Sequence, residues 1–213
     1  MNDVKCVAFD LGGVLIKSNQ DEAIRRFKAL GLNNADEYLD SYAQKSIFGE
    51  LENGDISADM FRQHLGDIIG RLPSEVECVY GWLGYFGGFP GYVRDMLVRL
   101  RNEGMRLVLL SNNNPFMMSF VRSTAFDGCG YSLCHYLDKL YVSYEMKLSK
   151  PQPEIFKALL ADEHLAPSEL MFVDDGSRNV EAASALGINA MLVANGEDWT
   201  DKFYKRLSDL RNQ

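Results

Sequence analysis

Short apolar runs alternate along this chain with longer segments in which apolar residues recur every three or four positions. The runs have the length of buried strands and lie at 7–9, 106–110, 139–143, 170–173 and 189–193. After residue 90, helical spacing fills the intervals at 93–100, 154–160, 180–186 and 199–213. Strands that alternate with helices predict an α/β fold built on a doubly wound parallel sheet.

The segment 18–89 differs, because no strand pattern interrupts its helical spacing. Four helices are expected there, at 23–30, 38–48, 57–69 and from 73 onward. A group of small residues then forms a return hinge: Gly84, Gly87, Gly88, Pro90 and Gly91. We therefore predict an all-helical cap domain, 18–89, inserted into a core domain made of 1–17 and 90–213.

A cap of this kind can act as a lid that excludes water and selects a substrate. Its apolar helix faces must also pack against one another, so most of its residues are structural. Five residues are candidates for contact with a substrate: Lys17, Ser18, Asn19, Tyr42 and Phe48.

Polar side chains follow three of the predicted strands directly. Asp10 ends the first strand at a glycine pair, 111–114 reads Ser-Asn-Asn-Asn after the second, and Asp174 and Asp175 follow the strand at 170–173. Lys150 precedes a proline-rich segment between them. Ligands of open α/β sheets bind at the carboxyl ends of the strands. An isolated aspartate there more often caps a turn, but the whole set predicts a site for metal binding or nucleophilic attack.

These segments resemble the haloacid dehalogenase-like hydrolase superfamily, and they occur in the order that the superfamily has. The resemblance rests on FDLGGVL, LLSNNN, SKPQPEIF and FVDDGSRNVEAASALGI. Within the superfamily the chain is similar to the small phosphatases with a helical cap, and especially to the α-D-glucose-1-phosphate phosphatase group, because Gly-Asp-Ile-Ser at 54–57 is like a stretch of that group's cap. The resemblance implies a Rossmann-like core and a Mg²⁺-dependent phosphomonoester hydrolase.

The resemblance also implies a role for each site residue. Asp10 attacks phosphorus and becomes an aspartyl-phosphate, while Ser111, Asn112 and Lys150 hold the phosphoryl group. The Mg²⁺ ligands are expected to be Asp10, the backbone carbonyl of Gly12, Asp175 and Asp174. Asp175 is favoured as a direct ligand, and Asp174 either binds through water or orients a neighbour. The substrate is a small phosphorylated metabolite such as a sugar 1-phosphate.

One position departs from the family's pattern. Most of its phosphatases carry a second aspartate two residues after the nucleophile as acid and base, and this chain has Gly12 there. A leaving group that needs little protonation, as in a sugar 1-phosphate, would explain the change. Two alternatives stay open: a metal-independent 2-haloacid dehalogenase-type hydrolase, and a catalytically silent phosphate-binding protein.

The composition of the chain excludes several classes of binding partner. The formal net charge of -8 argues against a nucleic-acid partner, because phosphate backbones attract basic surfaces. No run approaches the roughly 20 apolar residues of a membrane span, and no signal-peptide pattern is present, so we expect a cytoplasmic protein without a membrane partner. The four cysteines have no paired metal-ligand spacing, which favours reduced thiols over zinc. The sequence does not indicate an oligomeric state.

Overall fold

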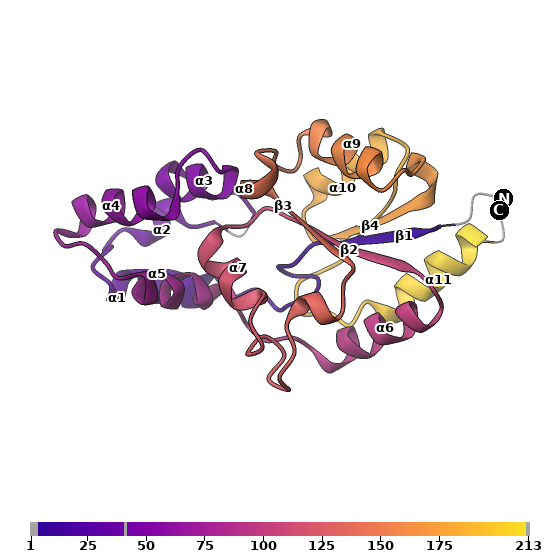
Figure 1. Cartoon of the computed structure of the whole chain (residues 1–213), viewed down its shortest axis with the longest axis horizontal. Coiled ribbons are helices and arrows are strands. Elements are labelled where there is room, and N and C mark those ends of the chain that lie inside the picture. Colours follow the sequence, from indigo (N-terminus) through magenta and orange to yellow (C-terminus); the bar gives the residue numbers. More distant parts are fainter. Residues whose placement is uncertain (1–3, 41, 212–213) are drawn as a thin grey trace.

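A computed structural model of the chain describes residues 4–40 and 42–211. Its centre is a five-stranded sheet in the order β3-β2-β1-β4-β5, and every pairing is parallel. The strands are β1 (Cys6–Phe9), β2 (Arg106–Ser111), β3 (Lys139–Val142), β4 (Leu170–Asp174) and β5 (Asn189–Leu192). The structure thus confirms the predicted α/β fold with its doubly wound parallel sheet (Figure 1).

Helices cover both faces of the sheet because neighbouring strand residues point in opposite directions. On one face Phe9 packs on Trp199 and Phe203, beneath α6 (Gly91–Asn102) and α11 (Thr200–Arg211). The other face packs on two helices, α9 (Pro153–Asp162) and α10 (Ser177–Ala185). Figure 1 shows these two pairs on opposite sides of the strands. The sheet is therefore buried on both faces, as its near-continuous apolar strands predict.

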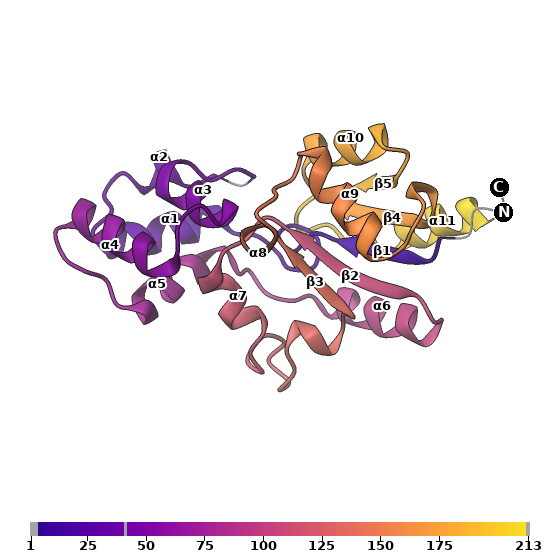
Figure 2. The same cartoon turned by 45° about the horizontal axis from the view of Figure 1, so that its top comes forward.

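The helices of the segment 18–89 gather beyond one end of the sheet (Figures 1 and 2). They are α1 (Gln20–Ala29), α2 (Ala35–Tyr38), α3 (Ser46–Asn53), α4 (Ala58–Ile69) and α5 (Glu75–Trp82). Their apolar faces meet around Phe48, whose ring lies 5.0 Å from the rings of both Phe27 and Phe61. Phe48 is fully buried there, so the prediction that it contacts a substrate is wrong.

The predicted helix at 38–48 is also wrong, because two short helices, α2 and α3, replace it. The Oδ1 atom of Asp40 accepts hydrogen bonds from the backbone amides of Tyr42 and Ala43. Such an Asx-type turn offers the backbone an alternative to helical hydrogen bonds. Apolar spacing alone could not reveal this break, since the apolar positions on both sides of it fit one helical pattern.

The two chain segments that connect the helical cap to the core pair with each other. The amide of Lys17 donates to the carbonyl of Gly88, and the amide of Gly87 donates to the carbonyl of Lys17. The side chain of Asn195 clamps Ser18 from the core, at 3.0 Å and 2.8 Å from its backbone N and O. A Cβ atom at Gly87 would lie 2.8 Å from the Lys17 carbonyl oxygen, so this close pairing requires glycine.

Two helices are absent from the sequence-based expectation: α7 (Pro115–Val121) and α8 (Ser143–Met146). Pro115 is the first residue of α7. The side chain of Asn114 caps this helix, and a proline is accepted at the first helical position because the backbone amide there has no partner within the helix. Three 3₁₀ turns complete the described part of the chain, at Leu83–Tyr85, Leu133–His135 and Pro167–Glu169. No helix within the described ranges has the length and apolar character that crossing a membrane requires.

Candidate active site

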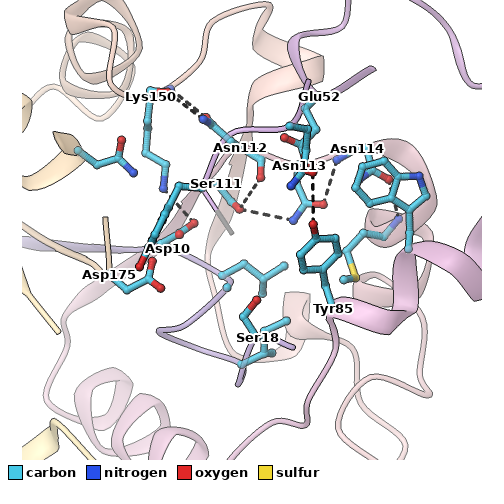
Figure 3. A pocket seen from close by; sticks show the side chains of 18 residues that line it. Asp10, Ser18, Glu52, Tyr85, Ser111, Asn112, Asn113, Asn114, Lys150 and Asp175 are labelled. Atoms are coloured by element: carbon cyan, nitrogen blue, oxygen red, sulfur yellow. Dashed lines mark hydrogen bonds and ion pairs between the residues drawn. The ribbon is translucent and has the colours of Figure 1, made fainter. Parts of the chain in front are cut away.

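The polar residues predicted from the strand ends come together at one edge of the sheet. Asp10 directly follows β1, whose two neighbours β2 and β4 end at Ser111 and Asp174. A pocket opens at this edge (Figure 3). Its walls include Asp10, Gly12, Ser111, Asn112, Lys150 and Asp175. The order of the strands explains this assembly. The chain runs from β1 to β2 and β3 on one side and then crosses back to β4 and β5 on the other, so the connections reverse direction at β1. Ligands of open α/β sheets bind where the connections reverse in this way.

Lys150 lies at the centre of the charged cluster and is almost fully buried. Its Nζ atom lies 2.9 Å from Oδ1 of Asp10 and 2.6 Å from Oδ2 of Asp174. Burial acts to lower the pKa of Lys150, but the charges of Asp10 and Asp174 outweigh it and raise that pKa. Lys150 therefore carries a permanent positive charge beside the carboxylate that is the candidate nucleophile.

Asp174 is fully buried and uses both of its carboxylate oxygens within the protein. Oδ2 accepts from Lys150, while Oδ1 accepts from the amide of Gly176 at 2.7 Å and from the side chain of Asn179 at 2.9 Å. These contacts favour the orienting role that the sequence left open for Asp174. It holds the ammonium group of Lys150 in place against Asp10.

The side chain of Asn112 fixes the backbone of Lys150. Its Oδ1 accepts from the amide of Lys150 and its Nδ2 donates to the carbonyl of the same residue, both at 2.8 Å. Ser111, one residue earlier, is buried in the pocket wall and accepts a long hydrogen bond from the side chain of Asn113. The Ser111 hydroxyl in turn donates a long hydrogen bond, 3.4 Å, to the carbonyl of Asn112. Asn112 thus uses its side chain to position Lys150, while Ser111 and Asn112 both line the pocket.

Three carboxylates at this edge of the sheet form a cluster that fits Mg²⁺, with Asp10 and Asp175 lining the pocket and Asp174 buried behind them. One oxygen from each of Asp10, Asp174 and Asp175 lies within 4.8 Å of the others. Burial, together with the charges of Asp10 and Asp174, raises the pKa of Asp175 to about 7. Burial likewise raises the pKa of Asp10 to about 6, against the opposing effect of Lys150. Because one lysine does not balance three carboxylates, the donor set suits a divalent cation with oxygen ligands.

The stability of the metal-free protein is expected to fall as pH rises from about 4 to 7. Asp10 and Asp175 have raised pKa values, so the stability linked to their protonated forms is fully present below about pH 4 and is lost on ionisation. Thermal unfolding in EDTA between pH 5 and pH 8 should show a loss on the order of 2 kcal/mol. Excess Mg²⁺ should reverse this trend, and a flat EDTA profile would contradict it.

Gly13 lets Asp175 approach the first strand's turn. Its φ of +73° lies in the left-handed region, and a Cβ atom there would lie 2.0 Å from Oδ2 of Asp175. We expect Gly13→Ala to displace Asp175 and weaken Mg²⁺ binding at least tenfold, as measured by Mg²⁺-dependent thermal stabilisation. Gly104→Ala is the matched control, because Gly104 has a φ of +79° and nothing within 4 Å of its added Cβ. Equal Mg²⁺ affinity in both variants would show that only backbone strain matters.

The cap and the first turn of α7 form the opposite wall of the pocket. Ser18 and Tyr42 line it as predicted, whereas the predicted contacts Lys17 and Asn19 do not. Asn19 instead caps α1 by accepting from the amide of Glu22. Asn113 and Asn114 of this wall belong to the polar segment 111–114 that the sequence placed at the site, whereas Gln44, Glu52 and Tyr85 were not anticipated. A neighbouring hollow shares Tyr42, Lys150, Asp175 and Asn179 with the pocket, so the site extends beside α10.

Glu52 is the most informative of the missed residues. It follows Phe48 by four positions on α3, and this spacing places it at the edge of the face that the apolar residues bury. The sequence shows that spacing. It does not show how the helix is oriented relative to the sheet, and without that orientation this helix face could not be assigned to the pocket.

Known proteins share these features over most of the chain. Residues 4–187 match the haloacid dehalogenase-like hydrolase family. The D-ribitol-5-phosphate phosphatase of Bacteroides thetaiotaomicron is 44% identical over 196 residues, which cover 92% of this chain and 95% of that protein. The chain therefore belongs to the haloacid dehalogenase-like hydrolase family.

Two solved structures share the fold along nearly their whole length. A predicted HAD-like family hydrolase from Porphyromonas gingivalis has a TM-score of 0.90 and 37% identity, covering 96% of this chain and 98% of its own. A HAD family enzyme from Bacteroides thetaiotaomicron, solved with magnesium and inorganic phosphate, has a TM-score of 0.85 and 36% identity, covering 94% and 99%. With the phosphatase relative, these structures confirm the prediction of a phosphatase of this family.

Proposed function

We propose that the chain is a Mg²⁺-dependent phosphomonoester hydrolase in which Asp10 is the nucleophile and carries an aspartyl-phosphate intermediate. One arrangement supports this most strongly. Lys150 bridges Asp10 and Asp174 within hydrogen-bond distance, in a cluster of three carboxylates of which Asp10 and Asp175 line the pocket. A halide displacement has no use for that acidic cluster, whereas a phosphoryl group bound by a divalent cation does.

Each residue in the proposed reaction has a separate task. Asp10 attacks phosphorus, and Lys150 offsets the negative charge of both the carboxylate and the phosphoryl group. Ser111 and the backbone of Asn112 donate hydrogen bonds to phosphoryl oxygens at the pocket wall. Mg²⁺, held by Asp10, Asp175 and the carbonyl of Gly12, supplies charge neutralisation and orientation for the phosphate. Residues 18–89 act as the cap and 1–17 with 90–213 as the catalytic core.

The substrate that we propose is the phosphate ester of a small sugar or sugar alcohol. The cap side of the pocket presents several hydrogen-bonding groups that suit hydroxyls, among them Gln44, Glu52 and the hydroxyl of Tyr85. The relative that acts on D-ribitol 5-phosphate supports an ester of a primary alcohol. A sugar 1-phosphate is the second candidate, because Gly12 cannot protonate a leaving group and an anomeric oxygen needs less help.

A panel of phosphate esters tests this function. Inorganic phosphate is measured from D-ribitol 5-phosphate, α-D-glucose 1-phosphate and acetyl phosphate, with Mg²⁺ and with EDTA. We expect Mg²⁺-dependent release with the highest kcat/KM for the ribitol ester. A preference for the 1-phosphate would select the second candidate instead. No release from any ester, together with halide release from a 2-haloacid, would overturn the proposal.

A further inference from the structure

The cap supplies a carboxyl group to the pocket that the catalytic edge of the sheet does not use. Glu52 lines the same pocket as Asp10, and Figure 3 shows it across the pocket from that residue. A group in this place faces the side of a phosphoryl group from which the alcohol leaves, because the nucleophile and the leaving oxygen are in line. Gly12 leaves that oxygen without a proton donor on the core side.

Contacts with the core hold the end of α3 that carries Glu52. Three side chains of the segment 143–149 donate to the residues 52–54: Ser143 to the carbonyl of Glu52, Ser149 to the side chain of Asn53 and Lys147 to the carbonyl of Gly54. Gly54 itself approaches so closely that an added Cβ would lie 2.4 Å from the carbonyl oxygen of Tyr144. Glu52 therefore has a fixed position relative to the core, although it belongs to the cap.

Asn114 lies beside the carboxyl group of Glu52. Its Oδ1 caps α7 by accepting from the amides of Phe116 and Met117, both at 3.1 Å. Its neutral side chain is close enough to Glu52 to act against the rise in the pKa of that carboxyl group. No lysine or arginine among residues 4–40 and 42–210 forms an ion pair with Glu52. The carboxyl group of Glu52 thus has an amide beside it and no cation that would hold it ionised.

The surroundings of Glu52 favour the protonated acid. Burial, together with the charge of Asp10, raises the pKa of Glu52 to about 8 against the opposing effect of Asn114. A carboxylic acid that keeps its proton near neutral pH is suited to general acid catalysis. The raised pKa of Glu52 supports the role in proton transfer that its position and contacts already indicate.

We propose that Glu52 is the general acid and base of the reaction and replaces, from the cap, the aspartate that the chain lacks at Gly12. This inference rests on the proposed function. In the first step Asp10 forms a bond to phosphorus, the bond to the alcohol oxygen breaks, and the proton of Glu52 passes to that oxygen. In the second step Glu52 takes a proton from water, whose oxygen bonds to phosphorus as the aspartyl-phosphate bond breaks. Asp10 is thereby regenerated as a carboxylate, Glu52 as an acid, and phosphate leaves.

The basicity of the leaving group gives a test that a structural role would not satisfy. Glu52→Gln keeps the size and polarity of the side chain beside Asn114, but it cannot transfer a proton to the leaving oxygen. With the best alkyl ester of the panel, kcat is expected to fall by about 10²–10⁴-fold. With p-nitrophenyl phosphate, whose leaving group needs no proton, we expect a rapid burst of one nitrophenolate per enzyme and then slow turnover. Glu50→Gln, on the exposed side of the same helix, should behave as wild type.

A second variant separates loss of the acid from loss of the fold. Gly12 has room for a side chain, since its added Cβ would meet only Ser18, at 3.9 Å. With the alkyl ester, the double variant Gly12→Asp with Glu52→Gln should have a kcat at least tenfold higher than that of Glu52→Gln alone. Equal losses with both esters and no burst, a change in KM alone, or no recovery in the double variant would each overturn the role of Glu52. An inactive wild-type enzyme would instead overturn the proposed function itself.

Discussion

Asp10→Asn is expected to lower kcat for phosphate release at least 10³-fold without destabilising the protein. The amide cannot attack phosphorus, and Asp10 is the carboxylate that Lys150 holds at 2.9 Å on the pocket floor. Because burial raises the pKa of Asp10, its charge is a cost to the metal-free fold, and removing that charge should leave the unfolding temperature equal or higher. Steady-state phosphate release and thermal unfolding in EDTA measure the two effects.

The control for this variant is Asp67→Asn, which changes an exposed aspartate of α4. It should retain the wild-type kcat. The nucleophile assignment would be contradicted if Asp10→Asn kept more than a tenth of the wild-type kcat with Mg²⁺ present.

Lys150→Met is expected to lose both activity and stability. The substitution keeps the length of the side chain but leaves Asp10 and the fully buried Asp174 without their counter-charge. Removing one partner of a buried ion pair typically costs about 3–5 kcal/mol of unfolding free energy. Loss of the charge that stabilises the phosphoryl group should lower kcat by about 10²–10³-fold. Urea unfolding and phosphate release measure these effects, with Lys157→Met, an exposed lysine of α9, as the control.

A double variant distinguishes a lost counter-charge from a lost packing contact. Combining Lys150→Met with Asp174→Asn removes the buried charge that the single variant leaves unpaired. We expect the double variant to be more stable than Lys150→Met alone, because a missing ion pair costs less than a broken one. If the two losses simply add, Lys150 stabilises the fold by packing and the electrostatic account of this cluster is wrong.

The sequence predicted the parts of this molecule that depend on local pattern. Each strand of the core was visible as a short apolar run, and the polar residues after three of these runs marked the catalytic edge, because parallel strands end together. Asp10, Ser111 and Asp175 could therefore be assigned to one site before their geometry was known. The roles of Asp10 and Gly12 in metal binding stay predictions, as do those of Ser111 and Lys150 in the reaction.

What the sequence could not predict depends on contacts between distant segments. Glu52 reaches the pocket because three core side chains bind the end of its helix, and such anchoring has no local signature. The break between α2 and α3 comes from one turn at Asp40, which helical spacing hides. Asn114 was recognised as polar, but its two places, as the cap of α7 and beside the carboxyl group of Glu52, become visible only in the fold.

The reaction intermediate gives the most direct test of the central claim. Enzyme in excess over a phosphate ester, with Mg²⁺, is quenched in acid within the first turnover, digested and analysed by mass spectrometry. We expect one phosphoryl group on the peptide that contains Asp10. It should be absent in Asp10→Asn and should be lost with time as phosphate appears. Phosphate release in the first turnover with no phosphoryl group on Asp10, or with one on another residue, would contradict the assignment of Asp10 as the nucleophile.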